Sequence, residues 1–268
     1  MNGEVVKRYR VVLGVEYCGT AYAGWQRQHH AATVQEHLER AVSRVANETV
    51  DVYCAGRTDA GVHGTGQVVH FDTSAKRDER AWVHGANTHL PEDVAVTWAA
   101  FVDASFHARF TAVARRYRYV IWNHSLRPAL LRHRVTWVYR PLNVEKMHCS
   151  AQYLLGEHDF SVFRSSACQA KTARREVTEI KVSRDREFIY IDIEANAFLH
   201  HMVRNIAGSL MEVGREEQPV SWLEALLQTR DRTQAGVTAP ADGLYFVAVR
   251  YPDKYRLPGL EGRFLPRF

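Results

Sequence analysis

The sequence predicts an α+β protein in which a β-α-β-β-α-β order occurs twice along the chain. Segments of strand-like composition alternate with segments whose apolar residues recur at helical spacing, and the second half repeats the alternation of the first. The chain has 268 residues, which at about 150 residues per domain allows one large domain or two modest ones. Its 46% hydrophobic and 24% charged residues suit a chain that buries a core, which excludes global disorder.

The first half contains four strand-like segments and two helical patterns. β-Branched and aromatic residues indicate strands at 9–17, 51–54, 67–72 and 94–102. Thr33 stands three residues before Glu36, which is the spacing of a capping box. Helical intervals then separate the apolar residues Val34, Leu38, Ala41, Val42 and Val45. A weaker helical pattern covers about 77–87 and ends before Leu90-Pro91.

The second half repeats this order. Strands are expected at 115–123, 177–182, 188–194 and 244–251, and a helix is expected at about 144–155. A further helix has an apolar stripe formed by Phe198, Met202, Ile206, Leu210 and Val213. Gly214 stands where the C-cap of that helix would lie, and Ser221 with Glu224 marks the start of an extra helix.

Two consecutive patterns of this kind predict a duplicated split-βαβ fold, the ferredoxin-like topology that RNA-recognition (RRM) domains also use. We expect two RRM-like halves with mainly antiparallel sheets. Because no low-complexity linker separates them, the halves are expected to meet at a central active-site cleft. The predicted domains are 1–108, which carries a loop around Asp59, and 109–268, which carries a basic segment.

The sequence shows no pattern for export or membrane insertion. Glu4, Lys7 and Arg8 interrupt the apolar residues at the start, so no signal peptide is expected. The best apolar run, 94–102, is far shorter than the roughly 20 residues that span a bilayer. The four cysteines are widely scattered, which fits reduced thiols better than a zinc ribbon or a disulfide scaffold. We therefore expect a cytoplasmic protein with no membrane partner.

Positive charge is concentrated in one stretch of the sequence. The formal net charge is +5, yet residues 104–144 contain eight arginines and no Lys, Asp or Glu. The aromatic residues interleaved with them are Phe106, Phe110, Tyr117, Tyr119, Trp122, Trp137 and Tyr139. This mixture suits phosphates and unstacked bases. Because like charges repel, such a concentration needs either an anionic partner, which favours nucleic acid, or buffering by nearby acids.

The stretch AGRTDAGVHG, residues 55–64, is the strongest candidate for chemistry. Its three glycines permit tight turns on both sides of Asp59. Arg57 stands two residues earlier, and a nearby guanidinium favours the ionised carboxylate, which is then available as a nucleophile or base. The alternative is an aspartate that only caps a turn.

Other kinds of site fit the sequence less well. Two glycines of this stretch have the spacing of a phosphate loop, but Val62-His63 replaces the Lys-Ser/Thr pair that such a loop requires. No second carboxylate lies close in sequence to form an acid/base dyad. The histidines lack the spacing of metal ligands, and the neighbours His200 and His201 are expected to point in different directions on a helix. We therefore expect no metal.

The stretch AGRTDAGVHGTGQVVHF resembles the TruA family of tRNA pseudouridine synthases closely. Further segments look like that family, in its order: EYCGTAYAGWQRQ (16–28), FHARF (106–110), ARRYRY (114–119), GEHDFSVFR (156–164), FLHHMVRNIAGSLMEVG (198–214) and GLYFVAVRYP (243–252). The resemblance covers nearly the whole chain. One departure is Cys18, where the family usually has Asp.

The resemblance implies that the protein converts uridine to pseudouridine at positions 38, 39 and 40 of the tRNA anticodon stem-loop, as a cofactor-free homodimer. It implies that Asp59 is catalytic, that Tyr117 packs on the target uracil and that Arg57 aids base flipping. It also implies that Arg204 pairs with Asp59, whereas the helical pattern alone leaves Arg204 facing either solvent or a polar cleft. The positions that look like the family's tRNA contacts are Arg77, Phe106, His107, Ala108, Arg109, Phe110, Ala167, Cys168, Gln169, Ala170 and Lys171.

The residue types suit this reaction. Uracil must leave C1′ of the ribose, rotate and rejoin through carbon, which calls for a carboxylate and an enclosed pocket but no metal or redox cofactor. Asp59 either adds to the sugar or base, or removes the C2′ proton to give a glycal, and the sequence leaves both open. The main alternative function is a non-catalytic tandem RNA-binding module, which does not account for Asp59. An RNA-dependent hydrolase is a third option.

Overall fold

The computed structural model describes residues 8–258, which divide into two compact units. The first unit contains residues 8–113 and 246–258, and the second contains Ala114–Tyr245. The units differ from the predicted domains because residues 109–113 and 246–258 belong to the first unit. The division into an RRM-like domain at 1–108 and another at 109–268 stays a prediction. The first seven residues, on which the expectation of no signal peptide partly rests, lie outside the described residues.

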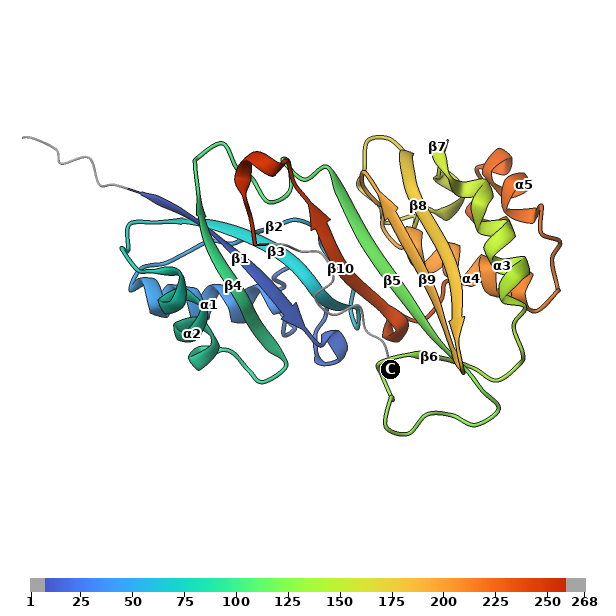
Figure 1. The fold of residues 1–268 in the computed structure, drawn as a ribbon, viewed down its shortest axis with the longest axis horizontal. Coiled ribbons are helices and arrows are strands. Elements are labelled where there is room, and N and C mark those ends of the chain that lie inside the picture. The colour runs from blue at the N-terminus through green and yellow to red at the C-terminus, as the bar shows by residue number, and fades with distance from the viewer. Residues whose placement is uncertain (1–7, 259–268) are drawn as a thin grey trace, which may run out of the picture. The chain divides into compact units, whose positions relative to one another are not determined.

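The first unit has the predicted order of elements (Figure 1). Its strands are β1 (Tyr9–Tyr17), β2 (Tyr53–Cys54), β3 (His63–Thr73) and β4 (Val94–Val102), and its helices are α1 (Val34–Ala46) and α2 (Glu79–His89). The strands form an antiparallel sheet in the order β4-β1-β3, with β2 paired to β3. β2 is shorter than predicted and β3 begins four residues earlier, at His63 rather than Gln67.

The helical and strand periodicities meet in the core of this unit. Alternate residues of β1, which are Val11, Leu13 and Val15, are at most 1% exposed. They share one hydrophobic cluster with Val34, Leu38 and Val42 of α1. Burying each such side chain contributes about 1.5–3 kcal/mol to folding. The predicted capping box is not formed, because Thr33 occupies the N-cap without a side-chain hydrogen bond to the helix.

The second unit contains the remaining elements. Its strands are β5 (Ala114–Asn123), β6 (Thr136–Val138), β7 (Gly156–Asp159), β8 (Arg174–Asp185) and β9 (Phe188–Ala195), and its helices are α3 (Val144–Ala151), α4 (Met202–Gly214) and α5 (Trp222–Thr229). The sheet order is β5-β9-β8-β7, antiparallel throughout, with β6 parallel to β5. β10 (Leu244–Arg250) runs across the boundary between the units. The α+β class with two halves is confirmed.

One detail of the second unit corrects the sequence interpretation. Gly214 is the last residue of α4, and Arg215 takes the C-cap position. A Cβ at Gly214 would lie 2.7 Å from the Sδ of Met147, so this glycine serves the close packing of α4 against α3. No described helix combines the length with the apolar sequence that a bilayer crossing requires.

The arginine-rich stretch is partly buffered by acids from other strands and loops. Arg116, Arg118 and Arg140 form ion pairs, at 3.2, 2.7 and 3.0 Å. Their partners are Glu179 of β8, Asp192 of β9 and Glu217. The Arg118–Asp192 pair is buried, with both side chains 6% exposed. The eight arginines that cluster in the sequence are therefore not eight unpaired cations. For these three arginines, acids buffer the positive charge, which is one of the two alternatives left open above.

Candidate active site

The Asp59 loop joins β2 to β3 in the first unit, and its N-terminal part is fastened to β3. The backbone N–H of Ala55 donates to the carbonyl of Val68 at 2.8 Å. The buried side chain of Gln67 donates from Nε2 to the carbonyl of Gly56 at 2.6 Å. The entry to the loop is therefore held by one backbone and one side-chain hydrogen bond.

The segment that follows β1 holds the other side of the loop. The backbone N–H of Trp25 donates to Thr58 O at 3.0 Å, and the N–H of Gly61 donates to Tyr22 O at 3.3 Å. Within the loop, the N–H of Val62 donates to Asp59 O at 3.1 Å, so the chain turns tightly at the aspartate. These bonds involve backbone atoms, so they orient Asp59 without engaging its carboxylate.

Close packing at a glycine allows this arrangement. Gly24 has φ +99°, a conformation that favours glycine. A Cβ at this position would lie 2.6 Å from Thr58 O and 3.1 Å from the carbonyl carbon of Asp59. The backbone of the post-β1 segment therefore approaches the loop as closely as only a glycine permits.

Two buried polar side chains support the loop and were absent from the predicted site. The hydroxyl of Tyr17 and Oγ1 of Thr58 are 2.9 Å apart, and burial raises the pKa of Tyr17. His63 accepts a 3.1 Å hydrogen bond at Nδ1 from the N–H of Gly19, so a neutral imidazole here carries its proton on Nε2. Their only sequence signal was their position within the segments that resemble the family.

Cationic groups flank the loop within the first unit. Asp59 is half-buried and Arg57 is exposed. Burial raises the pKa of the Cys54 thiol, at the start of the loop, to about 12, while the positive charges of Arg57 and Arg109 act in the opposite direction. Both guanidinium groups thus lie close enough to the base of the loop to influence its electrostatics.

The predicted contact segment 106–110 is split between buried and exposed side chains. Phe106 and Ala108 are fully buried, so their side chains hold the segment in place rather than offering a surface to RNA. Nδ1 of His107 accepts hydrogen bonds from the backbone N–H groups of Arg109 and Phe110, at 3.1 and 3.3 Å. Arg109 is exposed, and so is the ring of Phe110, at 75%. These two residues are the surface that the segment presents.

In the second unit, the structure places Tyr117 and Arg204 on β5 and α4. Tyr117 is 8% exposed and packs edge-on against Phe198, with ring centroids 4.9 Å apart. Arg204 is half-buried, and its Nε donates to the carbonyl of Ala239 at 2.8 Å. This bond fixes the side chain of Arg204 against the segment that precedes β10.

The second predicted contact segment, 167–171, is an exposed loop fastened by Arg164. Nη2 of Arg164 donates to the carbonyls of Cys168 and Ala170, at 2.6 and 3.0 Å. Ala167, Gln169 and Lys171 are exposed. Burial raises the pKa of the Cys168 thiol, but backbone hydrogen bonds from Ala170 and His200, together with Arg164, leave it below the ordinary value.

The expectation for the two adjacent histidines is wrong. His200 and His201 precede α4, and their rings lie together with centroids 4.0 Å apart. His201 has φ +63°, which turns the chain and brings its ring onto that of His200. A left-handed residue before the helix was not visible in the helical pattern.

Comparison with known proteins gives the chain its family. The family model described as tRNA pseudouridine synthase matches residues 14–111 and 150–252, which include Asp59, Arg57 and Arg204 but not Tyr117. Proteins named tRNA pseudouridine synthase A from Shigella boydii serotype 4 and Escherichia coli strain SE11 are each 59% identical over 250 residues, which is 93% of this chain and 93% of each relative. The chain belongs to the TruA family of tRNA pseudouridine synthases.

Proposed function

We propose that this protein isomerises uridine to pseudouridine at positions 38, 39 and 40 of the tRNA anticodon stem-loop, with Asp59 as the catalytic residue. The observation that carries the proposal is that the backbone around Asp59 is held in a fixed conformation. Its loop is fastened by backbone hydrogen bonds at Thr58, Asp59 and Gly61, and Gly24 packs directly against it. A carboxylate held on such a rigid turn suits chemistry that requires exact placement.

The remaining predicted substrate residues have separate tasks in this proposal. A uridine in a stem must leave the base stack before it reacts, which costs a few kcal/mol. Arg57, which is exposed beside Asp59, assists that step. Tyr117 packs on the flipped uracil, as the resemblance implies. The resemblance also implies that the guanidinium of Arg204 pairs with the carboxylate of Asp59. Nucleophilic addition by Asp59 and removal of the C2′ proton both remain open.

The proposed partners follow from the same resemblance. The tRNA contacts extend over Arg77 and the segments 106–110 and 167–171, and exposed Arg109 and Phe110 supply a cation and a stacking ring. We propose that the protein is a homodimer and that it needs no cofactor. We also propose that it acts in the cytoplasm, on tRNA present there.

The direct test is to incubate the protein with unmodified tRNA transcript in the presence of a chelator and to map pseudouridine along the anticodon arm. Pseudouridine at 38, 39 or 40 supports the proposal. Binding without any modification would favour the non-catalytic RNA-binding module, and release of free uracil would favour an RNA-dependent hydrolase.

The Tyr117→Phe variant is expected to bind tRNA within about threefold of the wild-type affinity, because stacking depends on the ring and not on the hydroxyl. Tyr117→Ala removes the ring and should slow isomerisation far more than Tyr117→Phe does. Filter binding and single-turnover assays on both variants check this. Much weaker tRNA binding by Tyr117→Phe would contradict the stacking role.

The Arg109→Ala variant is expected to reduce the salt dependence of tRNA binding by about one released counterion, because each phosphate contact contributes roughly one to the slope of log K against log salt. Measuring the affinity at four or more salt concentrations gives this slope. The matched control is Arg44→Ala, which removes an exposed cation in the last turn of α1 and should leave the slope unchanged. An unchanged slope in Arg109→Ala would remove Arg109 from the phosphate contacts.

A further inference from the structure

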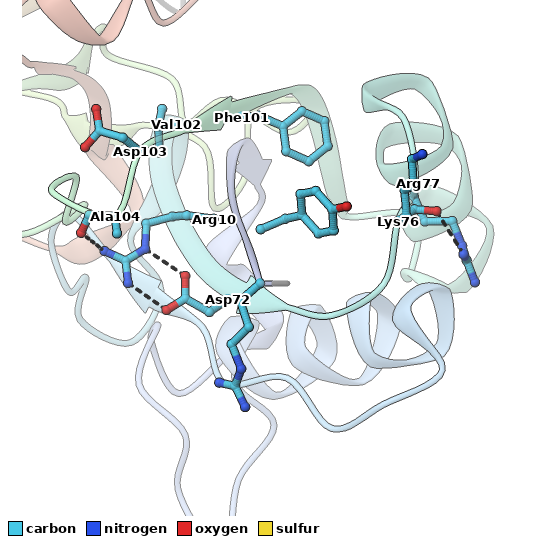
Figure 2. Close-up of a pocket in the computed structure, with 10 residues that line it drawn as sticks. Arg10, Asp72, Lys76, Arg77, Phe101, Val102, Asp103 and Ala104 are labelled. Atoms are coloured by element: carbon cyan, nitrogen blue, oxygen red, sulfur yellow. Dashed lines mark hydrogen bonds and ion pairs between the residues drawn. The ribbon is translucent and has the colours of Figure 1, made fainter. Parts of the chain in front are cut away.

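A groove at one end of the first unit's sheet contains one predicted tRNA contact, Arg77, while its other lining residues have no assigned role. Its volume is about 590 Å³, which is within the usual range for ligand sites. It is lined by the start of β1, the end of β3, the segment between β3 and α2, and the end of β4 with the two residues that follow it. Figure 2 shows Phe101 in this groove, with Lys76 and Arg77 on one side and the Arg10–Asp72 pair on the other. The groove thus combines an aromatic centre with charged walls.

The aromatic centre follows from the strand register. Phe101 of β4 lies opposite Val11 of β1, so it is diagonal to Tyr9 on the same face of the sheet. The two rings meet edge-to-face, with centroids 6.4 Å apart and an angle of 72°. The side chain of Phe101 remains 40% exposed. An edge-to-face pair engages an edge of one ring, so it leaves aromatic surface on which a further ring can stack.

The charge of the groove favours an anion. Four cationic and two acidic side chains line it, for a net charge of +2. Arg10 and Asp72 neutralise each other through two hydrogen bonds of 2.7 and 2.6 Å. The charges beyond this pair are the cations Arg8, Lys76 and Arg77 and the single carboxylate Asp103. Cations around an exposed aromatic pair form the combination that binds the phosphates and base of a single-stranded nucleotide.

Arg10 connects the groove to the segment 106–110. Its Nη1 donates to the carbonyls of Ala104 and Phe106, at 2.6 and 2.8 Å, while its other nitrogens hold Asp72. One wall of the groove is therefore also the anchor of the segment that presents Arg109 and Phe110.

We propose that this groove is a second RNA subsite, in which an unpaired nucleotide of the bound tRNA stacks on Tyr9 and Phe101 while its flanking phosphates contact Arg8 and Lys76. This inference rests on the proposed function, because tRNA is the RNA in question. Most of the lining residues are exposed, so the site is open at its sides. Such a shape suits a polymer that passes through better than it suits a free mononucleotide.

The test compares the Phe101→Ala variant with Tyr153→Ala, which removes a ring of similar exposure, 38%, in the second unit outside the candidate site. Phe101→Ala should weaken binding of full-length tRNA about tenfold, with an unchanged isomerisation rate at saturating tRNA. Phe101→Trp should restore the affinity, and Tyr153→Ala should leave it unchanged.

The Lys76→Ala variant tests the phosphate contact. It should lower the slope of log K against log salt by about one, whereas Arg80→Ala, on α2 but outside the groove, should leave this slope unchanged.

A second measurement uses the wild-type protein and does not depend on the folding of any variant. Photocrosslinking with tRNA that contains 4-thiouridine should yield peptides crosslinked at Tyr9 or Phe101. Crosslinks confined to the 106–110 segment, or wild-type affinity in Phe101→Ala, would overturn the subsite. A changed oligomeric state in Phe101→Ala with unchanged tRNA affinity would assign the groove to a second protein copy instead. Failure of the wild type to form pseudouridine while these crosslinks persist would overturn the proposed function and leave the subsite standing.

Discussion

Replacing Asp59 by Asn is expected to reduce pseudouridine formation by about 10⁴-fold or more, while tRNA affinity stays within about tenfold of the wild type. The amide has the shape of the carboxylate but serves neither as a nucleophile nor as a base. The fold of the loop should persist, because backbone hydrogen bonds at Thr58, Asp59 and Gly61 hold it and the substitution leaves these atoms unchanged. Single-turnover assays with excess enzyme, followed by mapping of the product, measure the chemical step directly.

The matched control is Asp51→Asn, which neutralises an exposed aspartate just before β2 in the same unit. Its isomerisation rate and tRNA affinity should equal those of the wild type. Wild-type turnover in the Asp59 variant would defeat the catalytic assignment. A large loss of tRNA affinity in that variant would instead indicate that the carboxylate is needed to hold the RNA or the loop.

The order of elements was predictable where a long segment has one clear period. β1, β4 and β5 alternate or run apolar over nine or ten residues, and α1 repeats its apolar residues over 13. Strands β6 and β7, with three and four residues, are too short to show a period and were missed. β6 is a strand because it pairs with β5, and β7 is a strand because it pairs with β8. Such pairing depends on the tertiary structure, so a local sequence pattern does not predict it.

The candidate site was predictable only in part, for a related reason. Asp59 and Arg57 lie in one short motif, so the sequence displays them together. The residues that hold the loop, such as Gly24 and Tyr17, are more than 30 positions away and reach it only in the folded chain. The same distance effect kept the charge analysis from choosing between its two alternatives, because the acids that pair with Arg116 and Arg118 come from β8 and β9.

The Gly24→Ala variant is expected to lose about 100-fold or more in isomerisation rate without any change to a group that touches the substrate. Alanine at φ +99° is strained by about 1–2 kcal/mol. Its Cβ would also lie 2.6 Å from the carbonyl oxygen of Thr58, so the Asp59 loop must move. A displacement of about 1 Å at a reacting group costs on the order of 100-fold in rate. Single-turnover rates at a temperature where the variant remains folded, checked by circular dichroism, measure the effect.

Gly156→Ala separates backbone strain from displacement of the loop. Gly156 has a similar φ of +91°, but a Cβ there would have its nearest neighbour, Nε2 of His158, at 4.0 Å. Both variants therefore carry comparable backbone strain, but only Gly24→Ala also forces a neighbouring backbone to shift, so it should lose more free energy of unfolding than Gly156→Ala. Gly156→Ala should keep the wild-type isomerisation rate when folded. If the two variants lose activity equally, the close approach at Gly24 does not position Asp59, and rigidity of this loop is not what the reaction requires.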